Sequence, residues 1–126
     1  MQEKDTEKQV KWTRSGRGFR IDVEAHADHV SLELHGEVDL YTQPILRSAI
    51  KDALDLGLPL LVFDFADVVH LDSGGMAILI SAAKKLMDRG GEVKLISVNR
   101  HIYRTLVLTG LAEFLNASPA EDERAA

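Results

Sequence analysis

The sequence predicts an α/β domain whose mixed central sheet has a parallel core and an antiparallel edge strand. Apolar and polar residues alternate strictly over residues 19–25 and again over 30–35, which indicates two half-buried strands joined as a hairpin. An almost unbroken apolar run at residues 58–65 indicates a strand that is buried on both faces. Helical patterns separate the later strands, and strands joined by such crossovers pair in parallel.

The chain opens with a polar segment that carries no strand or helix pattern. A turn-forming Ser-Gly-Arg-Gly stretch at residues 15–18 precedes the first alternating segment. We therefore expect residues 1–18 to form a disordered or loosely docked head, and the fold to begin near Phe19. The hairpin that follows turns at residues 27–28 and ends at Gly36.

Two amphipathic helices are predicted in the middle of the chain. The first begins at Thr42 or Gln43, with Pro44 in the first turn, where a missing N–H costs nothing, and ends at Gly57. The second runs over residues 74–89 and stops at a Gly-Gly pair. These helices lie on either side of the long apolar strand in the sequence.

The C-terminal third continues the alternation of strands and helices. A strand is predicted at residues 93–97, followed by a helix that Asn99 caps and that ends at Gly110. A short element follows at residues 111–115. We expect residues 118–126 to be a disordered acidic tail.

Composition and charge exclude several function classes. The length of 126 residues suits one domain, and the absence of cysteine excludes disulfides, thiolate metal sites and a cysteine nucleophile. The net charge is -5 although residues 1–18 hold five basic residues against three acidic ones, so the body of the chain is acidic and disfavours nucleic acid. No apolar run approaches the roughly 18 residues that span a bilayer, and the charged start is unlike a secretory signal. We expect a cytoplasmic protein with no nucleic-acid or membrane partner.

The segment 69–76 is the most informative for function, because it joins the apolar strand to the second helix. It places Ser73 at the N-terminus of that helix, where unsatisfied N–H groups and the helix dipole tolerate a phosphate or another anion. Gly74 and Gly75 leave the hydroxyl unshielded. An Asp-Ser pair before a helix is equally an ordinary N-cap, so the spacing alone leaves the function undecided. The segment is neither a Walker loop nor a nucleophile elbow.

Two motifs together resemble a known family. Residues 36–39 are Gly-Glu-Val-Asp after the second predicted strand, and residues 72–75 are Asp-Ser-Gly-Gly. With the Gly-Gly turn at 90–91 and Leu-Thr-Gly-Leu at 108–111, they resemble the bacterial anti-sigma-factor antagonists, small members of the STAS family. The resemblance covers residues 19–117 and implies a STAS-like fold with the helices packed mainly on one face of the sheet.

The resemblance implies a switch of binding partner controlled by phosphorylation of Ser73. The cognate anti-sigma factor would be a serine kinase with a GHKL-type ATP site, which the unphosphorylated protein binds so that the sigma factor is released. A PP2C-type phosphatase would reverse the modification. Many members have Ser or Thr where this chain has Gly74, so a second hydroxyl is missing here. The implied partner-binding residues are Gly36, Glu37, Asp39, Asp72, Gly74, Gly75 and Met76.

Other chemistry has weaker support in the sequence. His70 lies close to Ser73 and could pair with it, and acidic residues at 64, 67 and 72 could complete a triad. Nothing supplies a substrate pocket or an oxyanion hole, so we expect no enzyme activity.

The histidines around the hairpin are expected to be solvated. His26, His29 and His35 do not fall on one face at strand spacing, so we expect no metal and no cofactor.

Two alternative functions stay open. One is a STAS module of a stress-sensing scaffold or of a transporter accessory complex, and the other is a small-molecule or nucleotide-binding module that uses the helix N-terminus.

Overall fold

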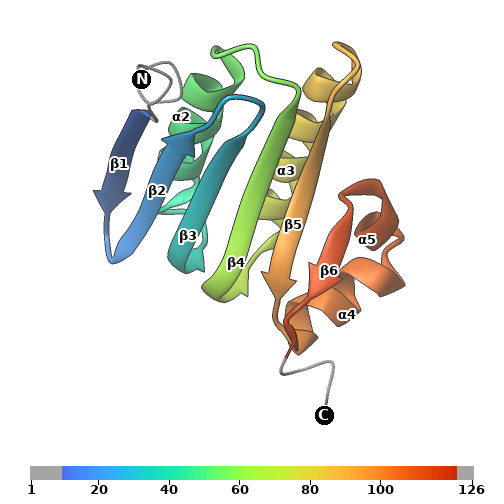
Figure 1. The fold of residues 1–126 in the computed structure, drawn as a ribbon. Coiled ribbons are helices and arrows are strands. Elements are labelled where there is room, and N and C mark those ends of the chain that lie inside the picture. The colour runs from blue at the N-terminus through green and yellow to red at the C-terminus, as the bar shows by residue number, and fades with distance from the viewer. Residues whose placement is uncertain (1–9, 122–126) are drawn as a thin grey trace.

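The computed structural model describes residues 10–121, which form one six-stranded sheet with helices (Figure 1). In chain order the elements are β1 (Val10–Gly16), β2 (Phe19–Ala25), β3 (Val30–Val38), α2 (Gln43–Leu54), β4 (Leu60–Leu71), α3 (Ser73–Met87), β5 (Glu92–Val98), α4 (Arg100–Leu108), α5 (Leu111–Phe114) and β6 (Ala117–Pro119). The strands lie side by side in the same order as in the chain. Pairing is antiparallel from β1 to β3 and parallel from β3 to β6, which confirms the predicted mixed sheet.

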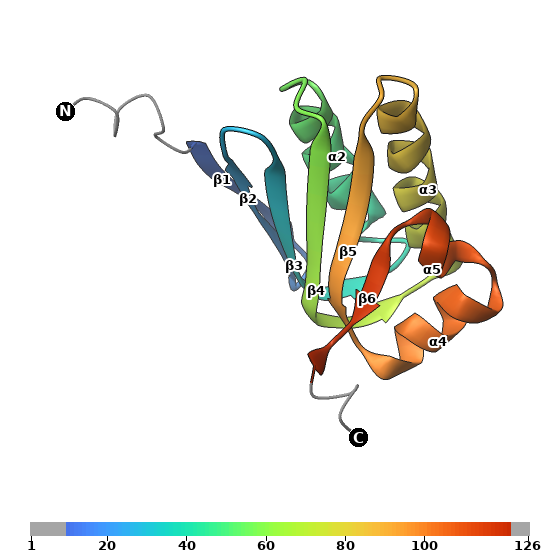
Figure 2. The same ribbon diagram turned by 45° about the vertical axis from the view of Figure 1, so that its right-hand side comes forward.

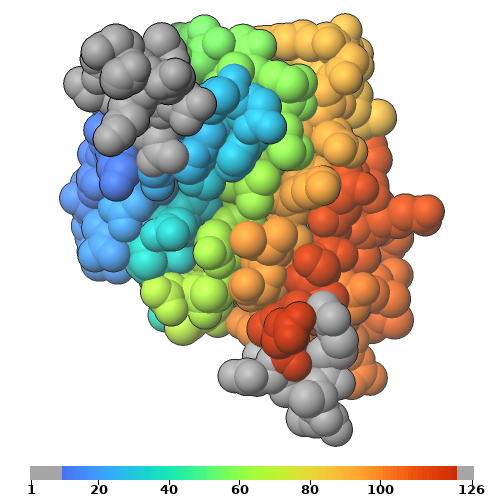
Figure 3. Space-filling view, viewed as in Figure 1, coloured from blue at the N-terminus to red at the C-terminus, as the bar shows by residue number. Residues whose placement is uncertain are grey.

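The helices α2 and α3 pack on one face of the sheet, as Figure 2 shows. They are the crossovers that join β3 to β4 and β4 to β5, and α4 and α5 lie beside β6 at the end of the sheet. In the part of the chain that the structure describes, the opposite face of the central strands carries no helix, so their side chains form the surface in Figure 3. This face is called the open face below.

The hydrophobic core lies between the sheet and the two crossover helices. Every second residue of the central strands points into it, as the alternating burial of β2 and β3 shows. One stripe of each helix faces the strands. The largest fully buried side chains are Phe19, Phe63, Phe65, Ile21, Leu32, Leu34, Leu46, Leu61, Leu79, Leu86, Leu95 and Leu106.

The prediction that the fold begins near Phe19 is wrong. Strand β1 pairs with β2 along its whole length, from Val10 opposite Ala25 to Gly16 opposite Phe19, so β1 and not β2 is the edge of the sheet. Only Trp12 of this strand packs against the core, and most of its other residues are exposed, which explains the missing apolar alternation. Residues 1–9 of the predicted head lie outside the described part of the chain.

The predictions of a strand buried on both faces and of a disordered tail from residue 118 need correction. Strand β4 extends to Leu71 and is covered on one face only, because Val62 and Asp64 stay half-exposed on the open face. Part of the predicted tail is ordered, since Pro119 of β6 pairs with Val98 of β5 and the backbone N–H of Ala120 donates to the Val98 carbonyl at 2.9 Å. The rest of that tail, residues 122–126, lies outside the described residues.

None of the helices between residues 10 and 121 is both long and apolar enough to cross a membrane.

Candidate functional site

Ser73 is the first residue of α3 and its side chain is exposed. The N-cap is the preceding residue, Asp72, whose extended backbone and carboxylate cap the helix by accepting a 2.8 Å hydrogen bond from the backbone N–H of Gly75. Within residues 10–121 the Ser73 hydroxyl makes no hydrogen bond. The two interpretations of the Asp-Ser pair are therefore compatible, because Asp72 performs the capping and Ser73 presents a hydroxyl to solvent.

Asp72 is held by a second helix as well. The side-chain amide of Gln43, the first residue of α2, donates to both carboxylate oxygens of Asp72 at 3.2 and 3.1 Å. This pair of bonds joins the N-termini of α2 and α3. Sequence reasoning treated Gln43 only as a helix start, and no spacing rule links it to a residue 29 positions later.

The two glycines after Ser73 have different neighbours. A Cβ on Gly75 would lie 2.5 Å from Val38 Cγ1 and 2.7 Å from Leu71 Cδ1, so only glycine lets α3 begin against the ends of β3 and β4. A Cβ on Gly74 would instead meet the side chain of Gln43. A larger residue at position 74 would displace that amide from Asp72, which gives a structural reason for glycine at this position.

The segment from Glu37 to Thr42 closes tightly beside Asp72. The Asp39 carboxylate accepts from the backbone N–H groups of Tyr41 and Thr42 at 2.9 and 3.1 Å, and the buried Thr42 hydroxyl donates to the Glu37 carbonyl at 2.8 Å. The Asp72 N–H donates to the Val38 carbonyl at 3.1 Å. The fold thus brings the two sequence motifs together, with Glu37 exposed and Asp39 used to shape its own loop.

Gly36 has a backbone role. Its φ angle is +118°, and a Cβ there would lie 2.8 Å from the Gly18 carbonyl oxygen. It lets β3 pass close to the turn between β1 and β2.

A family model described as the STAS domain matches residues 20–124. The chain belongs to the STAS domain family. The anti-sigma-B factor antagonist of Listeria monocytogenes is 30% identical over 100 residues, which cover 79% of this chain and 88% of that protein. The anti-sigma-B factor antagonist of Bacillus subtilis is 26% identical over 100 residues, which cover 79% and 91%. The crystal structure of an anti-sigma factor antagonist from Mycobacterium paratuberculosis matches with a TM-score of 0.70 and 26% identity, over 94% of this chain and 92% of that one.

Three exposed apolar side chains lie on the segments that precede α2 and α3 in this STAS domain. Leu40 and Tyr41 follow β3 and are 70% and 66% exposed, and Val69 near the end of β4 is 66% exposed. The Arg17 guanidinium lies 5.4 Å from the centre of the Tyr41 ring. Met76, predicted as a partner contact, is half-buried against the core. Sequence reasoning missed the three exposed residues because they fit no helix or strand period, although apolar surface of this kind marks interaction sites.

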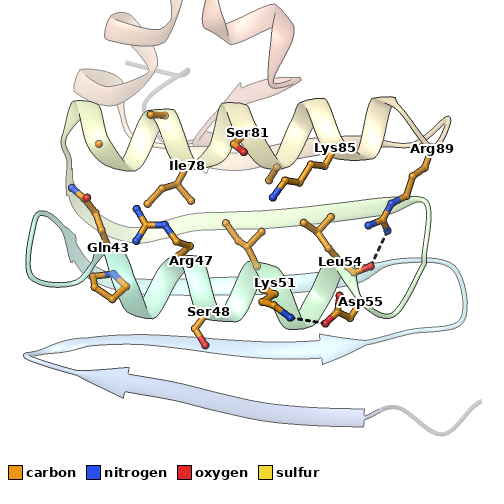
Figure 4. A pocket seen from close by; sticks show the side chains of 15 residues that line it. Gln43, Arg47, Ser48, Lys51, Leu54, Asp55, Ile78, Ser81, Lys85 and Arg89 are labelled. Atoms are coloured by element: carbon orange, nitrogen blue, oxygen red, sulfur yellow. Dashed lines mark hydrogen bonds and ion pairs between the residues drawn. The ribbon is translucent and has the colours of Figure 1, made fainter.

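A groove of about 930 Å³ runs between α2 and α3 and starts beside Gln43 and Gly74 (Figure 4). Its walls carry more cations than carboxylates. Arg89 donates to the Leu54 carbonyl at 2.8 Å, and Lys51 lies 3.3 Å from Asp55. The basic residues that line the groove are Arg47, Lys51, Lys85 and Arg89.

The histidines do not gather into one cluster. His26 and His29 stack at the hairpin turn with ring centroids 4.3 Å apart, and the hydrogen bond from His29 holds the pKa of Asp28 below its usual value. His35 lies on the open face, where its Nδ1 is 2.7 Å from Asp67. Among the described residues no hydrogen bond joins His70 to Ser73, so the structure does not assemble the triad considered above.

Proposed function

We propose that this STAS domain is an anti-sigma-factor antagonist that Ser73 phosphorylation switches off. The unphosphorylated form binds its anti-sigma factor, a serine kinase with a GHKL-type ATP site, and the sigma factor is released. A PP2C-type phosphatase reverses the modification, and the domain itself acts as a binding protein and not as an enzyme. The exposed position of Ser73 beside the capping residue Asp72 carries the proposal. The names of the relatives from Listeria monocytogenes and Bacillus subtilis support it.

A phosphate on Ser73 is compatible with the folded domain but weakens its binding to the anti-sigma factor. It adds about 1.5 to 2 negative charges at pH 7, and the N-terminus of α3 tolerates them through its dipole. The Asp72 carboxylate is adjacent, and the exposed Glu37 lies near the end of β3. Burying this concentrated negative charge against a partner costs desolvation and repulsion, which weakens binding by about two to three orders of magnitude.

The proposed partner surface consists of the seven residues inferred from sequence together with the exposed apolar side chains Leu40, Tyr41 and Val69. The contacts assign different roles to four of the seven. Gly36, Asp39 and Gly75 shape the backbone, whereas Glu37 presents an exposed side chain. Apolar side chains supply most of the affinity at such interfaces, and charge sets the specificity.

Kinase assays with a matched serine control test the proposal. The purified chain is incubated with ATP and candidate serine kinases of the histidine-kinase-like ATPase class, and the modified peptide is identified by mass spectrometry. Ser73→Ala should abolish phosphate incorporation, whereas Ser81→Ala, at an exposed serine of the same helix, should leave it unchanged. Continued phosphorylation of Ser73→Ala, or wild-type affinity of Ser73→Glu for the kinase, contradicts the proposal.

The basic groove favours a second candidate function, an anion or nucleotide-binding module. Arg47 and Lys85 line the groove from facing helices. Equilibrium dialysis with a nucleoside triphosphate and no protein partner distinguishes the candidates, since only the module retains nucleotide and loses it in Arg47→Ala. A pull-down that returns a scaffold or a transporter instead of a small kinase favours the remaining STAS alternatives.

A further inference from the structure

The strand register gathers three potential metal ligands on the open face. Asp22 of β2 lies directly opposite Glu33 of β3 in the antiparallel pair. His35 is two residues beyond Glu33, so its side chain leaves the same face of the strand. Like charges directly opposite each other destabilise a sheet, so this pair of carboxylates needs a compensating positive charge.

The donor atoms of the three residues are spaced as in a metal site. His35 Nε2 lies 3.3 Å from Asp22 Oδ2 and 3.8 Å from Glu33 Oε1, and all three side chains offer donors within 4.8 Å of one another. Zinc binds nitrogen and oxygen at about 2.0 to 2.2 Å in a tetrahedral arrangement, which separates the donors by about 3.3 to 3.5 Å. One ion fits between these donors with small side-chain adjustments.

A third carboxylate, that of Asp67, orients the imidazole. The pairing of β3 with β4 shifts register after Glu33, and this bulge places His35 opposite Asp67. Asp67 Oδ2 is 2.7 Å from His35 Nδ1, which is the contact that metal-binding histidines make through their second ring nitrogen. A proton on Nδ1 leaves the lone pair of Nε2 directed at the other two carboxylates.

The burial of His35 Nε2 supports the site independently of the spacing of the carboxylates. The atom is inaccessible to solvent and makes no hydrogen bond within residues 10–121, although it faces Asp22 and Glu33. A cavity of about 140 Å³ is lined by Glu33, His35 and Asp67 but not by Asp22. Arg20 forms an ion pair with Asp22 at 3.2 Å, whereas no Lys or Arg between residues 10 and 121 pairs with Glu33. The residues lining the cavity are Glu33, Leu34, His35, Asp64, Ala66 and Asp67.

We propose that Asp22, Glu33 and His35 bind one divalent transition-metal ion of the zinc class on the open face, with Asp67 as a positioning residue. Imidazole with carboxylates suits zinc, whereas magnesium and calcium prefer ligand sets made of oxygen alone. A water molecule completes four-coordination. The ion bridges β2 and β3 and relieves the repulsion between their carboxylates, and this role does not depend on the function of Ser73.

Zinc titration of the untagged protein tests the site. Isothermal calorimetry should show one tight equivalent of Zn²⁺, and NMR of the imidazole nitrogens should show a shift of His35 Nε2. His35→Gln and Asp22→Asn should each weaken zinc binding at least tenfold. Asp67→Asn should weaken it by about tenfold, as expected for a residue that orients a ligand. His101→Gln, at an exposed histidine of α4, is the matched control and should keep wild-type affinity.

The wild-type NMR titration keeps the test independent of how the variants fold. Absence of a zinc-dependent shift at His35 overturns the proposal, as does a response confined to the stacked pair His26 and His29. Wild-type zinc affinity in His35→Gln overturns it as well. A magnesium titration should leave the His35 nitrogens unchanged, and equal affinity for magnesium contradicts an imidazole ligand.

Discussion

The adjacent side chains of Asp72 and Ser73 have different roles. Asp72 satisfies a backbone donor of α3 and accepts the Gln43 amide, whereas the Ser73 hydroxyl faces solvent. A residue that both capped the helix and accepted phosphate would lose its cap on modification. Placing the acceptor one residue after the cap lets the modification alter binding while the helix start stays intact.

Asp72→Ala should lower the free energy of unfolding by about 1 kcal/mol, because the N-terminus of α3 loses its cap. Asp72→Asn is the matched control, because its amide oxygen still accepts from Gly75 and its cost should be smaller. Urea denaturation followed by circular dichroism measures both variants. Equal stability of Asp72→Ala and the wild type would show that the cap is not formed in solution.

Gly75→Ala should destabilise the domain by about 1 to 3 kcal/mol, because the added methyl overpacks the junction with Val38 and Leu71. Gly74→Ala should cost less, since its methyl meets the movable side chain of Gln43. The same denaturation experiment compares the two. A larger cost for Gly74→Ala would reverse the assignment of the steric constraint to Gly75.

Beyond its backbone pairing with β2, strand β1 contacts the rest of the fold through few side chains. Trp12 packs against the core, and Arg14 forms an ion pair with Asp52 of α2. An exposed ion pair contributes little, typically under about 1 kcal/mol, so the indole ring supplies most of the side-chain contribution to the docking of the strand.

Trp12→Ala should therefore lower the free energy of unfolding by about 1 to 3 kcal/mol through lost packing. Val10→Ala, on the same strand but 58% exposed, is the control and should stay within about 0.5 kcal/mol of the wild type. Thermal and urea unfolding measure both. If Trp12→Ala is as stable as Val10→Ala, β1 does not dock in solution as the structure has it.

The whole molecule has two unlike faces. Helices cover one side of the sheet and form the basic groove, the open face carries the cluster around His35, and Ser73 lies at the junction of β4 and α3. The acidic net charge is therefore unevenly distributed over the fold. Exposed apolar side chains also lie on the segments that precede α2 and α3.

Tyr41→Ala should weaken binding of the anti-sigma factor by at least about tenfold, since exposed aromatic side chains dominate such interfaces. Leu108→Ala, which removes the 76% exposed side chain on α4, is the control and should bind as the wild type does. Surface plasmon resonance with the immobilised kinase measures both. Equal loss in the two variants would argue against a partner surface centred on the Ser73 junction.

The sequence by itself predicted the order of the central strands and helices and the place of Ser73 at a helix start. Those features depend on local periodicity, glycine and capping signals, which lie within a few residues of one another. The Asp-Ser pair was located correctly for the same reason, although its spacing did not separate capping from phosphate acceptance.

Features that depend on contacts between distant segments became clear only from the tertiary structure. Strand β1 lacks an apolar pattern because only Trp12 faces the core, so its place at the edge follows from pairing with β2. The link from Gln43 to Asp72 and the gathering of carboxylates around His35 likewise depend on which elements become neighbours. Strand register and helix packing are non-local, and no spacing in the chain encodes them directly.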